Sequence, residues 1–120
     1  MDRQERRRFI RVALPHPVQY RLREESGGSW RAALMTDFSA AGLRFICDRT
    51  LKAGTPVEFE MFFPTRTGPY QFVTSVVWGR ATASGTSEHG VAFTALTPEQ
   101  QYEIDELVQF LIQDRTKQSS

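Results

Sequence analysis

The sequence predicts an all-β fold with one C-terminal helix, and three features of the chain support this. Several short segments alternate apolar and polar residues, which is the pattern of a half-buried strand. Glycine, proline and small polar residues separate these segments at regular spacing, as they do in β-barrels and β-sandwiches. The last apolar segment repeats instead at the spacing of an amphipathic helix. A chain of 120 residues is long enough for one domain with its own core.

The N-terminal part is predicted to be a flexible, arginine-rich tail that leads into a strand. The tail comprises residues 1–11, which are mostly charged, and the β-domain is assigned residues 12–96. Pro15 and Pro17 interrupt the first strand. Because proline cannot donate to a strand ladder, we expect this part of the strand to be bent or to lie at an edge.

Five further segments are predicted to be strands because they share the same alternation or a short apolar run. They are residues 30–35, 43–47, 57–63, 72–78 and 91–94. Turn-forming residues between the strands predict loops at 24–29, 37–42, 48–56, 64–69 and 79–90. Within the segment 72–78, strict alternation places Phe72, Thr74, Val76 and Trp78 on one face.

The C-terminal helix is predicted over residues 97–115. Thr97 precedes Pro98 and stands three residues before Gln100, which is the pattern of a capping box. Five apolar residues then recur on one helical face, and they are Ile104, Leu107, Val108, Leu111 and Ile112. Tyr102 and Phe110 lie off this stripe and either widen it or form a surface for a partner protein.

The arginines near the N-terminus form the first candidate binding feature. Arg6, Arg7, Arg8 and Arg11 stand close together, and the chain contains 13 arginines but only 2 lysines. A guanidinium group is a planar fork that binds a phosphate, or the O6/N7 edge of guanine, through two hydrogen bonds. A cluster of this kind is either a solvated tail or a site for a small, highly charged anion.

A second candidate feature lies between two apolar segments, where Asp37, Ser39 and Gly42 stand at fixed offsets. The carboxylate offers an acceptor for guanine N–H groups, and the hydroxyl offers a partner for phosphate or sugar. A glycine permits either close approach of the backbone or a positive φ after the turn.

Together the two features resemble the hallmarks of the PilZ domain, an Arg-x-x-x-Arg motif and a later Asp/Asn-x-Ser-x-x-Gly motif. Arg7 and Arg11 match the first, and Asp37, Ser39 and Gly42 match the second without departure. The first motif alone is common, but the pair in this order and at this distance is fairly specific. The resemblance covers almost the whole chain and implies a small antiparallel barrel of six to seven strands with the helix packed outside.

The resemblance implies a bacterial receptor for the second messenger cyclic di-GMP. Arg7 and Arg11 would bind phosphates and guanine edges, and the tail would fold over the face that holds Asp37 and Ser39. Roles of the family include control of motility, surface polysaccharide and virulence. With no output domain on the chain, we expect the signal to pass to a protein partner in trans.

In the family, a basic residue just before the first motif arginine accompanies binding of two stacked, mutually intercalated ligand molecules. Arg6 occupies that position here, and a ligand pair carries four phosphate charges that Arg6, Arg7, Arg8 and Arg11 could match. We therefore expect two ligands per chain. Trp78 is either a core residue or, as an aromatic on the strand before Gly90-Val91-Ala92-Phe93, a residue that stacks on guanine.

Other functions find less support in the composition. The net charge of +1 argues against a nucleic-acid-binding barrel, and the widely separated His16 and His89 argue against a metal site. No nucleophile elbow or Walker motif is present, so we predict a binding protein without catalysis or cofactor. The single cysteine, Cys47, is predicted to be buried and fits a reducing, cytoplasmic location. The main alternative is an adaptor of the same fold that binds no cyclic di-GMP.

Overall fold

The computed structural model describes residues 11–25, 27–62 and 68–119. These residues form six strands, one α-helix and two short 3₁₀ helices. The strands are β1 (Arg11–Leu22), β2 (Arg31–Ser39), β3 (Gly42–Cys47), β4 (Pro56–Met61), β5 (Tyr70–Ala81) and β6 (Ser87–Phe93). The helices are η1 (Arg23–Glu25), η2 (Ala83–Gly85) and α2 (Pro98–Ser119).

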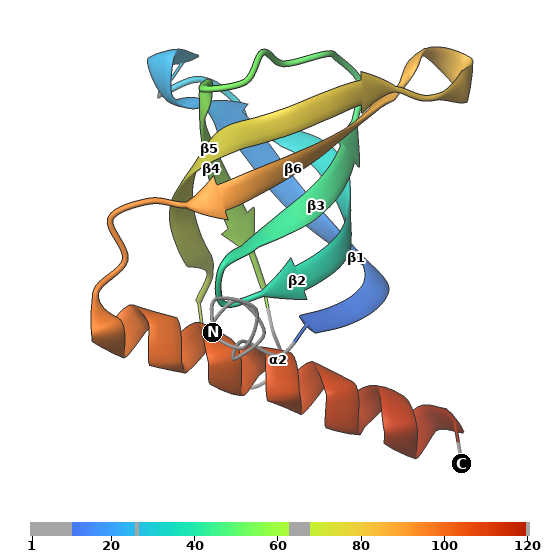
Figure 1. Cartoon of the computed structure of the whole chain (residues 1–120), viewed down its shortest axis with the longest axis vertical. Helices are drawn as coiled ribbons and strands as arrows, with labels where there is room; N and C mark the ends of the chain where they lie inside the picture. Colours follow the sequence, from blue (N-terminus) through green and yellow to red (C-terminus); the bar gives the residue numbers. More distant parts are fainter. Residues whose placement is uncertain (1–10, 26, 63–67, 120) are drawn as a thin grey trace, which may run out of the picture.

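The strands form a closed antiparallel barrel in the order β1-β2-β3-β6-β5-β4 (Figure 1). The barrel with one C-terminal helix confirms the predicted fold class. β4 pairs with β5 and with only the last four residues of β1, Gln19 to Leu22. Pro15 and Pro17 precede this stretch and have no β4 neighbour, so their missing N–H groups cost no ladder hydrogen bond on that side.

The inside of the barrel is an aromatic and aliphatic core. Alternate residues of each strand point inward, and the ring centroids of Phe45 and Phe59 lie 4.9 Å apart in an edge-to-face contact. Tyr20 and Phe38 are also fully buried. This core confirms that the period-two alternation identifies the inward face of the strands.

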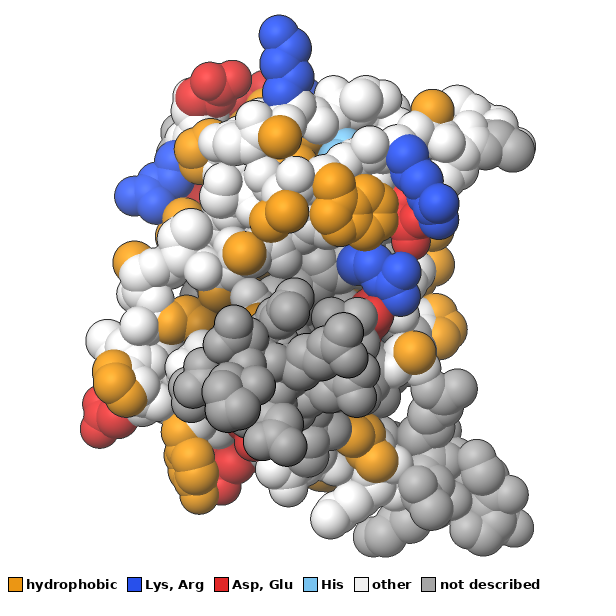
Figure 2. All heavy atoms as spheres, viewed as in Figure 1, with side chains coloured by type: hydrophobic (Ala, Val, Ile, Leu, Met, Phe, Trp, Pro, Cys, Tyr) orange, Lys and Arg blue, Asp and Glu red, His pale blue; other side chains and the backbone are white. Residues whose placement is uncertain are grey.

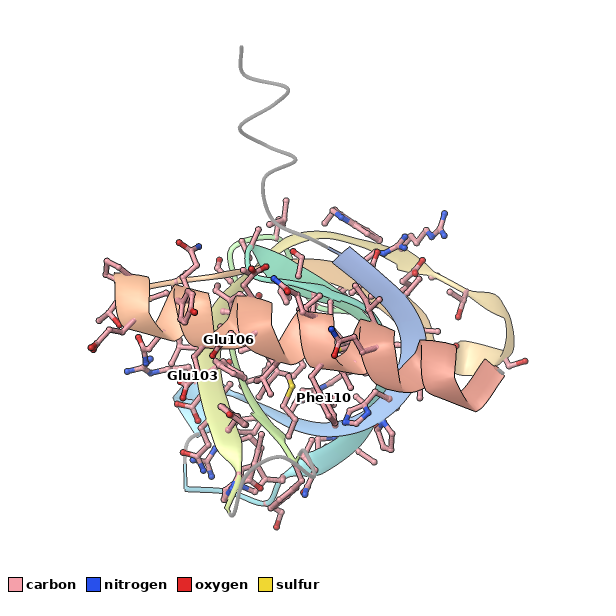
Figure 3. All side chains as sticks on the ribbon, turned by 90° about the horizontal axis from the view of Figure 1, so that it is seen from below. Glu103, Glu106 and Phe110 are labelled. Carbon is pink, nitrogen blue, oxygen red and sulfur yellow. The ribbon has the colours of Figure 1, made fainter. Side chains whose placement is uncertain are left out.

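Helix α2 lies across one end of the barrel, as Figure 3 shows from below. The predicted apolar stripe packs against the core, with Ile104, Leu107, Val108 and Leu111 buried. Its N-terminus has the predicted capping box: the Gln100 N–H donates to the Thr97 hydroxyl at 3.1 Å, and the Thr97 N–H to the Gln100 side chain at 2.9 Å. The helix continues to Ser119, four residues beyond the predicted end.

The two residues off the stripe behave differently. Phe110 is partly buried and packs against the core, so it widens the apolar face. Tyr102 is 68% exposed and does not. No helix within the described ranges is long and apolar enough to cross a membrane.

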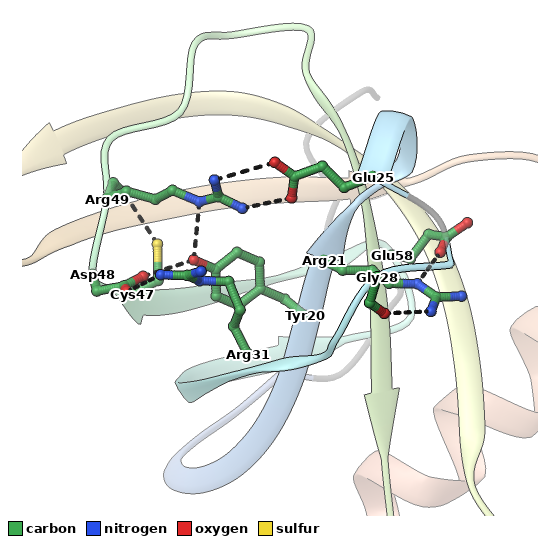
Figure 4. Close-up of polar contacts among 9 residues, drawn as sticks. All are labelled: Tyr20, Arg21, Glu25, Gly28, Arg31, Cys47, Asp48, Arg49 and Glu58. Carbon is green, nitrogen blue, oxygen red and sulfur yellow. Dashed lines mark hydrogen bonds and ion pairs between the residues drawn. The ribbon is translucent and has the colours of Figure 1, made fainter.

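A polar network covers the opposite end of the barrel, where η1 and the loop after β3 meet (Figures 1 and 4). The Tyr20 hydroxyl donates to Asp48 at 2.8 Å and accepts from Arg49 Nε at 3.3 Å. Arg49 continues to Glu25 at 3.0 Å, and Arg31 donates to Asp48 at 2.7 Å. Burial, and secondly the bond to Asp48, raise the pKa of Tyr20 to about 12.

Two predicted loops are shorter than expected because strands extend into them. The loop predicted at 79–90 contains the end of β5 and the start of β6, which the ion pair between Arg80 and Glu88 at 2.7 Å bridges. The turn predicted at 37–42 is reduced to Ala40 and Ala41. Serine and glycine suggested loops there, yet cross-strand pairing holds both segments extended.

Candidate ligand-binding site

The second motif lies at the junction of β2 and β3. Asp37 and Ser39 end β2, and Gly42 begins β3. The predicted tail residue Arg11 in fact starts β1, and its backbone is in register with Ser39. Arg11 of the first motif therefore lies beside Ser39 of the second motif in the backbone of adjacent strands. Arg6, Arg7 and Arg8 lie outside the described residues.

Ser39 shapes the tight turn that joins the two strands. Its Oγ accepts a hydrogen bond from the Ala41 N–H at 3.1 Å, which is a side-chain turn of the type that serine favours. The Ser39 oxygen is the acceptor in this bond, so the bond does not use the hydroxyl hydrogen as a donor. The Ala40 carbonyl in the same turn accepts a hydrogen bond from Gln101 of α2 at 3.3 Å. The motif turn is thus tied directly to the helix.

A β-bulge in β2 sets the direction of Asp37. Met35 pairs with Phe45 and Asp37 pairs with the adjacent Arg44, so Thr36 is an extra residue on β2. Met35 and Phe38 both point into the core, and between them Asp37 faces the outer wall of the barrel. Bulges of this kind often re-aim side chains beside binding sites.

Asp37 forms an ion pair with Arg44, a residue that the sequence analysis did not single out. Arg44 Nε and Nη2 donate to Asp37 Oδ2 at 3.1 and 2.8 Å. The carboxylate is buried, whereas the Arg44 side chain is 41% exposed. The signal in the sequence was the position of Arg44 two residues after Gly42, which places it opposite Asp37 in a hairpin whose turn is Ala40 and Ala41.

A second bulge directs Trp78 outward and corrects the predicted alternation in β5. Val76 pairs with Val91 and Trp78 with Gly90, so Val77 is the extra residue. Val76 remains in the core, but Val77 is 58% and Trp78 38% exposed. The interpretation of Trp78 as a core residue is therefore wrong, because the bulge reverses the alternation after Val76.

The indole of Trp78 packs against Gly90 on the adjacent strand. A Cβ atom at Gly90 would overlap the Nε1 and Cε2 atoms of the indole. Glycine at this position lets the ring lie close to the β6 backbone. The indole thus covers Gly90 while Trp78 stays 38% exposed.

Gly42 serves close strand pairing, and its φ lies outside the left-handed region. It is in register with Ala92 of β6, and a Cβ atom here would overlap the Val91 carbonyl oxygen. Of the two predicted reasons for this glycine, close approach is the one that the geometry supports. The close partner is the neighbouring strand.

These residues line a pocket of about 370 Å³ on the outer wall of the barrel. Asp37, Arg44, Gly90 and Trp78 form one row across β2, β3, β6 and β5, since each is in register with the next. Figure 2 shows this face, where arginine and carboxylate side chains lie beside hydrophobic ones. A cationic fork next to an aromatic ring is suited to a nucleobase.

The histidine and cysteine inside the barrel lie apart from this pocket. Cys47 and His89 are both buried, with Sγ and Nδ1 3.9 Å apart. Burial raises the pKa of the Cys47 thiol and lowers the pKa of His89, so both groups are neutral near pH 7. The His89 Nε2 accepts the Leu51 N–H at 2.9 Å. Within the described ranges, His, Cys, Asp and Glu side chains form no group of three that could hold a metal ion.

Comparison with known proteins adds a family match and several similar folds. The family model of the PilZ domain matches residues 5–113. No curated protein matches the chain in sequence. The PilZ domain of YcgR from Escherichia coli, solved with c-di-GMP, has a TM-score of 0.69 at 17% identity, over 95% of this chain and 97% of that one.

Two longer proteins contain the same fold. The Bacillus subtilis inhibitor of motility, MotI/DgrA, has a TM-score of 0.67 at 15% identity over 92% of this chain. The MrkH–c-di-GMP complex of K. pneumonia has a TM-score of 0.70 at 13% identity over 93% of this chain. This chain spans 52% of the first and 55% of the second.

Proposed function

The chain belongs to the PilZ domain family, and on that premise we propose that it is a non-catalytic receptor for cyclic di-GMP. The observation that carries the proposal is the pocket that Asp37, Ser39 and Gly42 of the motif line together with Trp78. The structures of YcgR and MrkH, which share the fold, contain c-di-GMP.

The chemistry of the pocket matches the parts of such a ligand. Trp78 presents an exposed ring on which a guanine can stack, and base–aromatic stacking contributes roughly 1–3 kcal/mol. The Ser39 hydroxyl offers a donor to a phosphate or sugar oxygen. Arg7 and Arg11 supply guanidinium groups for phosphates and guanine edges, and the backbone of Arg11 beside Ser39 supports this assignment.

We further propose that two intercalated ligand molecules bind per chain. The support is the run Arg6, Arg7 and Arg8, which together with Arg11 supplies four positive charges against the four phosphate charges of a ligand pair. Neutralising a compact anion of this charge needs several guanidinium groups at short range. One ligand per chain would leave part of this charge unmatched.

The ligand-bound protein is proposed to act on a protein partner in trans. The turn that carries the motif is joined to α2 by the hydrogen bond from Gln101 to the Ala40 carbonyl, so a shift of the turn changes a contact of the helix. The exposed ring of Tyr102 lies one residue beyond Gln101 and is the proposed start of the partner surface. The alternative of a ligand-free adaptor would use the same helix.

Isothermal titration of the protein with cyclic di-GMP at low and high salt tests the proposal. We expect saturable binding near two ligands per chain that weakens with salt, because exposed charges are screened. A stoichiometry of one ligand per chain would contradict the proposed ligand pair but would still support the receptor function. Absence of heat at high protein concentration would contradict the receptor and favour the adaptor.

A further inference from the structure

We infer that Arg44, which belongs to neither motif, reads the guanine edge in this pocket, and that Asp37 acts by positioning Arg44. The inference rests on the proposed function, because it takes cyclic di-GMP as the ligand. It differs from the sequence-based expectation that Asp37 itself accepts the guanine N–H groups.

The burial of the two side chains separates their roles. The side chain of Asp37 is 4% exposed, whereas the side chain of Arg44, which bonds to its carboxylate, is 41% exposed. Both Nε and Nη2 of Arg44 donate to the same carboxylate oxygen, at 3.1 and 2.8 Å. A base entering the pocket therefore meets the guanidinium before it meets the carboxylate.

The ion pair also fixes which donors of Arg44 remain for a ligand. A guanidinium has five N–H groups, and this contact uses the N–H of Nε and one N–H of Nη2. The two N–H groups of Nη1 and the second one of Nη2 form the remaining edge. Two parallel donors of this kind match the O6 and N7 acceptors of guanine, whereas adenine presents a donor in place of O6.

The neighbours of Arg44 place this edge within reach of a stacked base. Arg44 on β3 and Trp78 on β5 are both in register with Gly90 on the strand between them. Their backbones are thus separated by two strand spacings, about 10 Å. The indole of Trp78 lies over Gly90 and so extends from β5 into that interval. A base stacked on the indole can extend over β6 toward the guanidinium.

The two assignments involve different edges of the base, so ligand analogues can separate them. A carboxylate that accepts guanine N–H groups senses the exocyclic N2 amine, which hypoxanthine lacks. A guanidinium on O6 and N7 does not sense that amine, but it loses an acceptor when N7 is replaced by carbon. Cyclic di-IMP and the 7-deazaguanine analogue of cyclic di-GMP are therefore the probes.

The experiment titrates the wild-type protein, Arg44→Ala, Arg44→Lys and Asp37→Ala with cyclic di-GMP and both probes. We expect the wild-type protein to lose about 5- to 150-fold in affinity with the 7-deazaguanine analogue, the range for a bidentate guanine contact. Cyclic di-IMP should bind nearly as well as cyclic di-GMP. In both Arg44 variants the penalty for the 7-deazaguanine analogue should be much smaller than in the wild-type protein, since neither alanine nor lysine has the fork. The guanine edges assigned to Arg7 and Arg11 account for the penalty that remains.

Positioning by Asp37 predicts a non-additive result. Asp37→Ala should weaken binding of cyclic di-GMP and reduce the loss of affinity that the 7-deazaguanine analogue shows. In the double variant, Asp37→Ala added to Arg44→Ala should change the affinity for cyclic di-GMP less than twofold. Arg31→Ala is the matched control, because Arg31 is bonded to Asp48 at 2.7 Å in the polar network, at the end of the barrel opposite α2. Thermal unfolding confirms that each variant is folded.

Two results would overturn the inference, and they are distinguishable. A penalty for the 7-deazaguanine analogue that is undiminished in Arg44→Lys, together with a large loss for cyclic di-IMP that Asp37→Ala removes, would assign base reading to Asp37. This result would leave the proposed cyclic di-GMP receptor function supported. Failure of the wild-type protein to bind cyclic di-GMP would overturn the proposed function and this inference with it.

Discussion

Gly42 shows how one motif residue serves the architecture of the site. Its missing side chain lets β3 approach β6, where a Cβ atom would overlap the Val91 carbonyl oxygen. The same pairing brings Gly90 and Ala92 of β6 into the wall of the pocket. The glycine of the motif is therefore explained by strand packing, and its effect on binding is expected to be indirect.

Replacing this glycine should destabilise the barrel. In Gly42→Ala the new methyl group must displace backbone, so we expect a loss of about 1–3 kcal/mol in the free energy of unfolding. Urea unfolding provides the measurement. Ala41→Ser adds one atom at the exposed neighbouring position and should leave stability nearly unchanged. Equal stability of Gly42→Ala and the wild-type protein would mean that β3 and β6 can separate at this point without cost.

Arg11 is the first-motif residue whose backbone lies beside the second motif. Arg11→Ala should reduce the affinity for cyclic di-GMP at least about tenfold, because hydrogen bonds to charged groups contribute roughly 1.5–3 kcal/mol. The thermal midpoint of the unliganded protein should change little. Arg23→Ala, at an exposed arginine just beyond the other end of β1, is the control and should bind normally. A large fall in the midpoint of Arg11→Ala would assign Arg11 a structural role.

At the scale of the elements, the two bulges in β2 and β5 decide which side chains reach the pocket. The extra residues Thr36 and Val77 reverse the alternation, so Asp37 and Trp78 face outward although Met35 and Val76 face the core. Both bulged strands flank the pair β3 and β6. The site is thus a product of two local irregularities brought together across four strands.

Helix α2 is the second element that matters for the site, and its capping box is testable. Thr97→Ala removes the hydroxyl that accepts the Gln100 N–H and should cost about 1 kcal/mol in the free energy of unfolding. Tyr102→Ala, on the same helix at an exposed position, should cost much less. Chemical denaturation of both variants makes the comparison. Because alanine has a higher helix propensity than tyrosine, an equal loss in both variants would contradict a stabilising role of the cap.

At the scale of the whole molecule, the barrel is covered at both ends by different means. Apolar side chains of α2 cover one end, and the network around Tyr20, Asp48 and Arg49 covers the other. The ligand pocket lies on the outer wall between them. Core packing is therefore separate from the surface that the proposed ligand would contact.

The polar end predicts how stability depends on alkaline pH. The pKa of Tyr20 is raised to about 12 in the folded protein from its ordinary value of 10.0, so the unfolded chain releases this proton first. The stabilisation is complete below about pH 10 and is lost as the pH rises toward 12. In Tyr20→Phe the fall in the free energy of unfolding between pH 10 and 12 should be shallower. Tyr102→Phe, an exposed tyrosine, serves as the control and should follow the wild-type profile.

Much of this architecture was predictable because it is encoded in local patterns. Period-two alternation identified the strands, as at Val57, Phe59 and Met61, and the spacing of Thr97 and Gln100 identified the helix start. Side-chain chemistry at fixed offsets identified Asp37, Ser39 and Gly42 as a motif. Each of these signals involves residues only a few positions apart, so each can be recognised within a single short segment of the sequence.

The tertiary structure alone decided what those residues contact. The ion pair of Asp37 with Arg44 depends on the register of the β2–β3 hairpin, and the outward direction of Trp78 depends on a bulge. The need for glycine at position 42 depends on the approach of β6. Bulge positions and strand register are set by which residues of distant segments pair, because a one-residue shift exchanges the inner and outer faces. The sequence by itself determined the strands, the helix and the candidate residues, and the closure of the barrel determined how they form a pocket.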